Sequence, residues 1–268
     1  MPPIACPECA SYDLDGRPAD DGRIETQCQD CGHSWLRGEP RPTPRKQPDS
    51  SKLREVFAER YLVSDEARRR VEVLKQRFLA DRPGPRPEVA VYWQKYQRVF
   101  SQQGLPGADP QHLKDFANDS TGANPGNMSV FNTAWNSAPA ESAARTRDAI
   151  AYLLHGPPEI PLEDRLTALI EGEHGIGMTG FREALLTKVL CVVHPDRFLP
   201  IVKYTGLAGK KEIAEKLFGL RLPDGDSAQW TIGRLVLWSN DLLVSVIGDG
   251  FVDQPHAAAF LWWAKDEV

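Results

Sequence analysis

The sequence predicts a mainly α-helical protein, in which a small β module precedes a larger helical domain with at most a short strand pair. Two observations support this prediction. The first 36 residues are polar, rich in turn-forming residues and contain four of the five cysteines. From residue 51 onward, apolar residues recur mostly three or four positions apart, which is the period of a helix with one buried face.

The cysteine spacing identifies the β module as a zinc ribbon. Cys6 and Cys9 form one Cys-x2-Cys pair, Cys28 and Cys31 form a second, and 18 residues separate the pairs. This spacing lies in the range found for zinc sites. Four thiolates complete a tetrahedral shell and leave no position for water, so we expect one structural Zn²⁺ per chain. The alternative is a pair of redox-active dithiols. His33 is a possible substitute ligand, which four thiolates make unnecessary.

Composition divides the chain into three parts. Residues 1–36 form the ribbon, residues 37–50 form a linker with four prolines and several basic residues, and residues 51–268 form the helical domain. Proline lacks a backbone donor and fixes its own φ angle, so the linker can neither run as a helix nor pack a core. A Gly/Asn/Pro-rich loop at 118–127 allows a division of the helical domain near 104–127.

Capping and breaking residues predict the main helices. Ser64 can cap a helix whose first turn holds Asp65 and Glu66. Gly104 ends an amphipathic segment over 89–100, and Pro110 begins a short helix that runs to Phe116. Further helices are predicted over 143–154, 162–170, 181–193, 211–218, 232–247 and 257–263, with one extended stretch over 198–202.

Hydropathy and charge restrict the compartment and the partners. No apolar run approaches the roughly 18 residues that cross a bilayer, and no signal peptide is recognisable, so the sequence predicts a cytoplasmic protein without a membrane partner. The net charge is −5 over residues 1–36, +7 over 37–98 and −7 over 99–268. A basic middle between acidic ends indicates a local anionic partner; the alternative is an ordinary solvated helix face.

The basic middle suggests contacts with nucleic acid. Arg68, Arg69, Lys75 and Arg77 lie on one predicted helix, where they would bind phosphates in a salt-dependent way. Aromatic and amide side chains nearby in sequence could hold a base by stacking and by hydrogen bonds to its edge. These candidates are Trp93, Asn132 and Trp135, together with Tyr92, Tyr96 and Asn136. The alternative is that aromatic residues at helical spacing belong to the core.

Catalytic motifs are not recognisable in the sequence. The nearest text to a phosphate-binding P-loop, from Gly206 to Lys211, is too short and lacks the hydroxyl residue. Asp196 has no partner carboxylates in the arrangement of a metal-dependent nuclease, and Cys191 lies on an apolar helix face, as a core residue would. The sequence therefore favours a non-enzymatic role, with no catalytic residue assigned.

One passage resembles a known family. The stretch from Phe181 to Ile201, with its turn His194-Pro195-Asp196-Arg197, is similar to a region N-terminal to the ATPase module of McrB-like, modification-dependent restriction proteins. The similarity extends over about residues 130–265. It implies a DNA-recognition or adaptor region of a defence system. This chain lacks the nucleotide-hydrolysing module, so a separate ATPase or nuclease subunit would have to act with it.

Together these features predict a DNA-binding protein of a restriction or defence system, with a sensing or adaptor role and no catalysis of its own. The DNA could carry modified bases. One alternative is a zinc-ribbon adaptor that binds proteins and no nucleic acid. Another is a nuclease whose catalytic residues are not recognised. Pairing of the basic residues with Glu55, Glu59, Glu66 and Glu72 would favour the adaptor, because such pairs would neutralise the basic face.

The ribbon hypothesis predicts a metal content. Protein purified under reducing conditions should contain about one zinc per chain. The Cys28→Ser variant should lose that zinc and unfold residues 1–36, while the helical domain keeps its circular dichroism signal and melting temperature. Elemental analysis that detects no zinc in the wild-type chain would refute the hypothesis.

Overall fold

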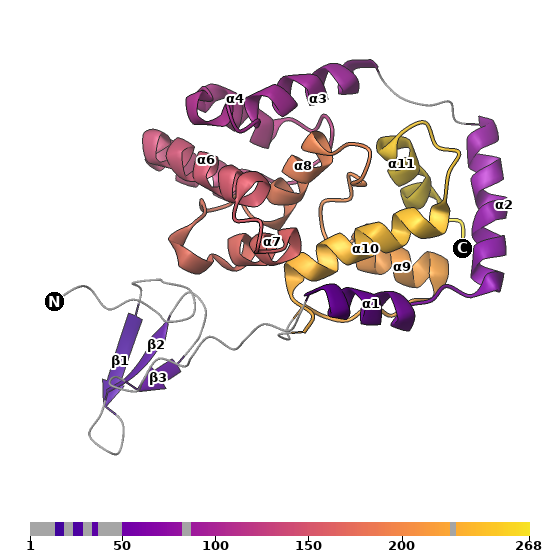
Figure 1. Ribbon diagram of the computed structural model, residues 1–268, viewed down its shortest axis with the longest axis horizontal. Coiled ribbons are helices and arrows are strands. Elements are labelled where there is room, and N and C mark those ends of the chain that lie inside the picture. The colour runs from indigo at the N-terminus through magenta and orange to yellow at the C-terminus, as the bar shows by residue number, and fades with distance from the viewer. Residues whose placement is uncertain (1–13, 19–23, 29–33, 37–49, 82–86, 226–228) are drawn as a thin grey trace.

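Two buried helices, α8 (Glu183–Val193) and α10 (Ile232–Ile247), lie at the centre of the helical domain, and other helices pack around them (Figure 1). The computed structural model describes residues 14–18, 24–28, 34–36, 50–81, 87–225 and 229–268. Residues Leu185 to Val192 of α8 are all buried, as are residues Gly233 to Asn240 of α10. Their largely apolar sequences explain why they occupy the core.

All the other long elements described in this domain are also helices, which confirms the predicted mainly α fold. They are α1 (Ser50–Arg60), α2 (Asp65–Asp81), α3 (Pro87–Val99), α4 (Pro110–Asn118), α5 (Ser129–Ser137), α6 (Pro139–His155), α7 (Leu162–Glu171), α9 (Lys210–Phe218) and α11 (Gln254–Ala264). Short 3-10 helices span Leu105–Gly107 and Glu173–Gly175. None of the described helices has the length and apolar character needed to span a membrane.

The N-terminal module contains an antiparallel sheet in the order β1-β2-β3. Its strands are β1 (Leu14–Pro18), β2 (Ile24–Cys28) and β3 (Ser34–Leu36). Leu14 pairs with Cys28, and Thr26 pairs with both Gly16 and Trp35. Cys6, Cys9, Cys31 and the side chain of Cys28 lie outside the described residues, so the zinc site stays a prediction.

The predicted helix ends agree with local capping. The Ser64 hydroxyl accepts a hydrogen bond from the Ala67 amide at 3.2 Å, which fixes the start of α2. Asp109 caps α4 by accepting from the Gln111 amide at 2.7 Å, ahead of Pro110. One hydrophobic cluster includes buried side chains from Leu53 to Ala264, on both sides of residues 104–127.

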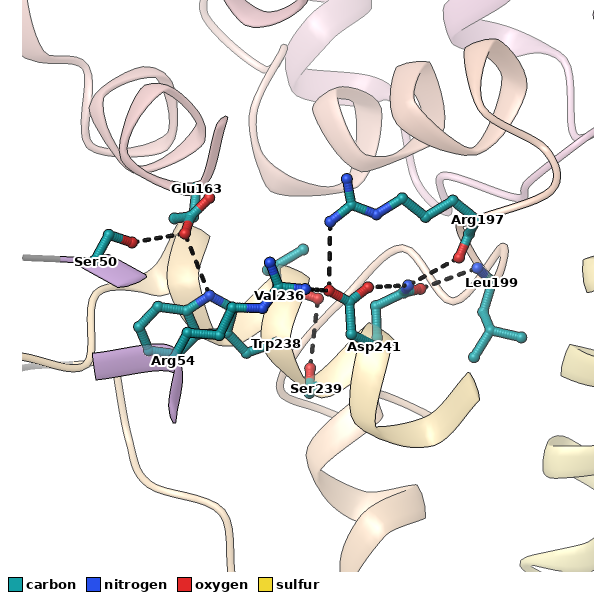
Figure 2. Close-up of polar contacts among 10 residues, drawn as sticks. Ser50, Arg54, Glu163, Arg197, Leu199, Val236, Trp238, Ser239 and Asp241 are labelled. Atoms are coloured by element: carbon teal, nitrogen blue, oxygen red, sulfur yellow. Dashed lines mark hydrogen bonds and ion pairs between the residues drawn. The ribbon is translucent and has the colours of Figure 1, made fainter. Parts of the chain in front are cut away.

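Two local predictions were wrong. Helix α5 was not predicted; at its start the Asn127 side chain accepts a hydrogen bond from the Ser129 amide at 2.8 Å. Residues 198–202 form no strand. Instead, the Asn240 side chain of α10 accepts from the Leu199 amide and donates to the Arg197 carbonyl, each at 3.0 Å (Figure 2). A buried amide thus satisfies backbone groups that a neighbouring strand would otherwise bind.

Helices α7 and α10 approach each other very closely at Gly233. A Cβ atom there would lie 2.1 Å from the Glu163 carbonyl oxygen and 2.6 Å from the Thr167 amide nitrogen. The Gly233 amide instead donates to the Thr167 hydroxyl at 3.1 Å. Beside it, Arg234 makes a bidentate pair with Asp164, with Nε–Oδ1 at 2.8 Å and Nη2–Oδ2 at 3.2 Å. The Arg234 side chain is fully buried.

This buried pair predicts a large loss of stability when one partner is removed. Asp164→Ala should lower the free energy of unfolding by about 3–5 kcal/mol, because the buried Arg234 charge loses its bidentate partner. The matched control is Glu141→Ala, which breaks the exposed Arg145–Glu141 pair on α6 and should cost about 0.5 kcal/mol or less. Urea denaturation measures both; equal losses would contradict the assignment.

Candidate nucleic-acid interface

The four basic residues predicted to bind phosphate do not form one surface. Arg68, Arg69 and Arg77 are exposed on α2. Lys75 is buried, with 7% of its surface exposed, and its Nζ donates to the Ile247 carbonyl at 2.8 Å. Its assignment as a phosphate contact is therefore corrected: the aliphatic stem packs in the core and the charge binds a free carbonyl at the C-terminal end of α10.

The arginines of α2 are not neutralised by the glutamates at helical spacing. Arg70 donates to the Leu217 carbonyl at 2.8 Å, and Arg68 makes a marginal contact of 3.4 Å with the Val63 carbonyl. Arg77 pairs with Glu267 at 3.2 Å. Within the described part of the chain, Arg69 has neither a hydrogen bond nor an ion pair. Because backbone carbonyls do not cancel the charge, Arg68, Arg69 and Arg70 remain cationic toward solvent.

The charge excess of the basic middle is nevertheless small on α1 and α2 themselves. Residues 50–81 carry eight basic and six acidic side chains. Most of the +7 therefore belongs to residues 37–49 and 82–98, which are only partly described. The net charge of one helix therefore does not locate an anion site. Such a site depends on basic side chains that come together in space from several elements.

Such a convergence occurs where α2, α9 and the end of α11 meet. An open hollow of about 590 Å³ is lined by Arg70, Lys216, Lys265, Asp266 and Val268. The three cations come from three separate elements. Lys216 also pairs with Glu212 and Lys265 with Asp266, both at 2.8 Å. We call this the basic hollow. Sequence reasoning missed Lys216 and Lys265, since neither lies in the basic middle of the chain.

The predicted base-binding side chains belong to the core or its edge. Trp135 is 4% exposed, and its ring packs against Phe131 with centroids 5.4 Å apart. Trp93 is half-buried, and its indole nitrogen has no partner among the described residues. Asn132 exchanges two side-chain hydrogen bonds with Asn118, at 2.7 and 3.0 Å. No stacking cage is formed, so the core alternative holds for Trp135.

The rest of the aromatic set is also structural. Tyr92 and Tyr96 lie with ring centroids 4.6 Å apart, and Tyr96 packs on Phe116 at 4.8 Å. Burial raises the pKa of both tyrosines above its ordinary value, with nearby carboxylates adding to the effect. Both phenols therefore stay neutral at physiological pH. They serve as packing surfaces.

Buried lysines and the buried cysteine also have structural roles. Burial lowers the pKa of Lys188 to about 8, and its Nζ donates to the carbonyls of Phe116 and Asp119 at the end of α4. Burial likewise lowers the pKa of Lys210 to about 8; it donates to the Ile201 carbonyl at 2.6 Å. The Cys191 thiol is buried and its pKa is raised to about 12, as expected for an inert core cysteine.

The described residues hold no group of three or more His, Cys, Asp or Glu side chains able to bind a metal. The turn at His194 to Arg197 borders a hollow of about 300 Å³ with Gln97. Gln97 donates to the Val192 carbonyl at 3.2 Å, and Arg197 contacts Asp241. These contacts brace α3 and α10 against the turn, consistent with the structural interpretation of that sequence.

Comparisons with protein-family models, with curated proteins and with solved structures gave no match.

The burial of Trp135 predicts the outcome of its replacement. Trp135→Ala should lower the free energy of unfolding by about 3–5 kcal/mol, because it leaves a large cavity. Val130→Ala is the matched control, since Val130 lies on the same helix and is 61% exposed; it should change stability little. Thermal melts measure both. An unchanged Trp135→Ala melt combined with weaker nucleic-acid binding would show that the indole faces a ligand.

Proposed function

We propose that the chain binds nucleic acid, most readily DNA, and does so without catalysis of its own. The observation that carries this proposal is the basic hollow, where Arg70, Lys216 and Lys265 converge from three elements beside Asp266 and Val268. Convergent cations on an open surface suit the contacts of a phosphate backbone, which position a duplex without reading its sequence.

The donors in this hollow are only partly used. Arg70 uses one Nη2 on the Leu217 carbonyl, and a guanidinium has five N–H donors in total. Lys216 is 46% exposed beyond its pair with Glu212, and exposed pairs of this kind are weak. Arg69 adds an exposed charge on the same helix as Arg70. Only 13% of the Lys265 side chain is exposed, so a phosphate would compete for Arg69, Arg70 and Lys216 first.

The biological setting in this proposal comes from the resemblance of residues 130–265 to the McrB-like region. On that basis the chain is a cytoplasmic sensor or adaptor of a restriction or defence system, and its DNA could carry modified bases. The zinc ribbon at residues 1–36 adds a second recognition module. A separate ATPase or nuclease subunit would cut the DNA. The chief alternative, an adaptor that binds no nucleic acid, is separated from this proposal by the experiment below.

Binding is measured by fluorescence anisotropy, with the full chain and labelled duplexes that contain or lack modified cytosine. Four phosphate contacts would give a log–log salt slope of about −3.6. Lys216→Gln and Arg69→Ala should each weaken binding about three- to tenfold on every duplex, since phosphate contacts do not specify sequence.

Arg145→Ala is the control for these variants. Arg145 is an exposed arginine that is paired with Glu141 on α6, and 54% of its side chain is exposed, so its loss should leave affinity unchanged. Absence of duplex binding by the full chain at about 50 mM salt would refute the proposal. Equal weakening by Arg145→Ala would also count against the basic hollow as the contact.

A further inference from the structure

A second hollow, of about 290 Å³, follows the line where α1 and α10 run side by side (Figure 1). Its lining residues on α1 and just beyond it recur at spacings of three and four, and so do those on α10. They are Arg54, Phe57, Ala58, Tyr61 and Leu62 on one side, and Trp238, Asp241, Leu242, Ser245 and Val246 on the other. Each stripe has five residues that span nine positions, and the α10 stripe, which is helical throughout, is about 12 Å long.

The groove has an aromatic floor and aliphatic walls. Phe57 and Trp238 form the floor, each 2% exposed, with ring centroids 5.7 Å apart. Leu62 is 71% exposed at one wall, and Leu242 and Val246 are half-buried at the other. A leucine that exposed beside a preformed apolar floor is a natural contact for another apolar side chain.

The mouth of the groove is cationic. Asp241 is its one lining carboxylate, and its Oδ2 binds the guanidinium groups of both Arg54 and Arg197 (Figure 2). Half of the Arg54 side chain remains exposed. Arg68 also lines the hollow, and its side chain makes only the marginal contact with the Val63 carbonyl among the described residues. The single carboxylate therefore cannot neutralise the rim, which leaves positive charge for an acidic partner.

We propose that this groove docks an amphipathic, acidic helix from a separate protein. An occupant with apolar residues at i and i+4 would place them between Leu62 and the α10 wall, and glutamates beside them would face Arg54 and Arg68. Helices recognise grooves by this spacing. A phosphate backbone could bind the cations but would leave the aliphatic walls without an apolar contact. The groove therefore favours a peptide over nucleic acid. The groove shares no lining residue with the basic hollow, so peptide docking is independent of nucleic-acid binding.

The probe is a fluorescein-labelled, alanine-based helical peptide of about 15 residues, long enough to hold helix, with two leucines four residues apart and glutamates beside them. The full chain should bind it. Leu62→Asp should weaken binding at least about tenfold, since it places a carboxylate on an apolar wall. A peptide with lysines in place of the glutamates should also bind at least about tenfold more weakly.

Val91→Asp is the matched control, because Val91 is 67% exposed on α3 and lines none of these hollows. It should leave peptide binding unchanged, and circular dichroism shows whether both variants remain folded. Labelled duplex is titrated in parallel. The proposal is overturned if the acidic peptide does not bind, if both variants weaken it equally, or if Leu62→Asp weakens duplex binding and not peptide binding.

Discussion

The amide of Asn240 connects the centre of the fold to its surface. It lies in the buried half of α10 and binds the backbone of Arg197 and Leu199 through both of its polar atoms. A buried amide with both ends satisfied holds one geometry strongly, because any other arrangement leaves buried donors or acceptors without partners. The segment after α8 is thereby held against α10.

That connection places charge at the surface. With its backbone held by Asn240, Arg197 directs its guanidinium to Asp241, the next residue on α10, which Arg54 of α1 also binds (Figure 2). Ser50 at the start of α1 donates to Glu163 at 2.6 Å. Helix α1 is thus fastened to α7 and α10 by polar contacts at both of these points. The groove between α1 and α10 can then remain partly open to solvent.

Much of the fold could be predicted because its signals are local. The Ser64 cap and the long apolar pattern of 232–247 located α2 and α10 closely. Residues 198–202 were assigned wrongly because the group that binds their backbone, Asn240, lies about 40 residues away in sequence. Helix α5 follows a Gly/Asn/Pro loop, and Asn127, whose side chain accepts from the Ser129 amide at the start of the helix, was assigned to that loop.

The site was less predictable, because it depends on where side chains converge. A charge run on a helix does not show that Lys75 turns inward to the end of α10, nor that Arg70 meets Lys216 and Lys265. The aromatic spacing of 92–96 correctly allowed a core interpretation, and burial of Tyr96 and Trp135 supports it. The proposed zinc ligands, in contrast, follow from cysteine spacing alone and need no tertiary information.

The close approach at Gly233 also bears on evolution. Any side chain at position 233 would clash with the backbone of α7. A descendant with this architecture must therefore retain glycine there or move α7 and α10 apart. The neighbouring Arg234 and its partner Asp164 are constrained together for a different reason, since neither tolerates loss of the other. Distant relatives could therefore be found by a Gly-Arg pair in the first turn of the helix that corresponds to α10, together with an aspartate in the first turn of the helix that corresponds to α7.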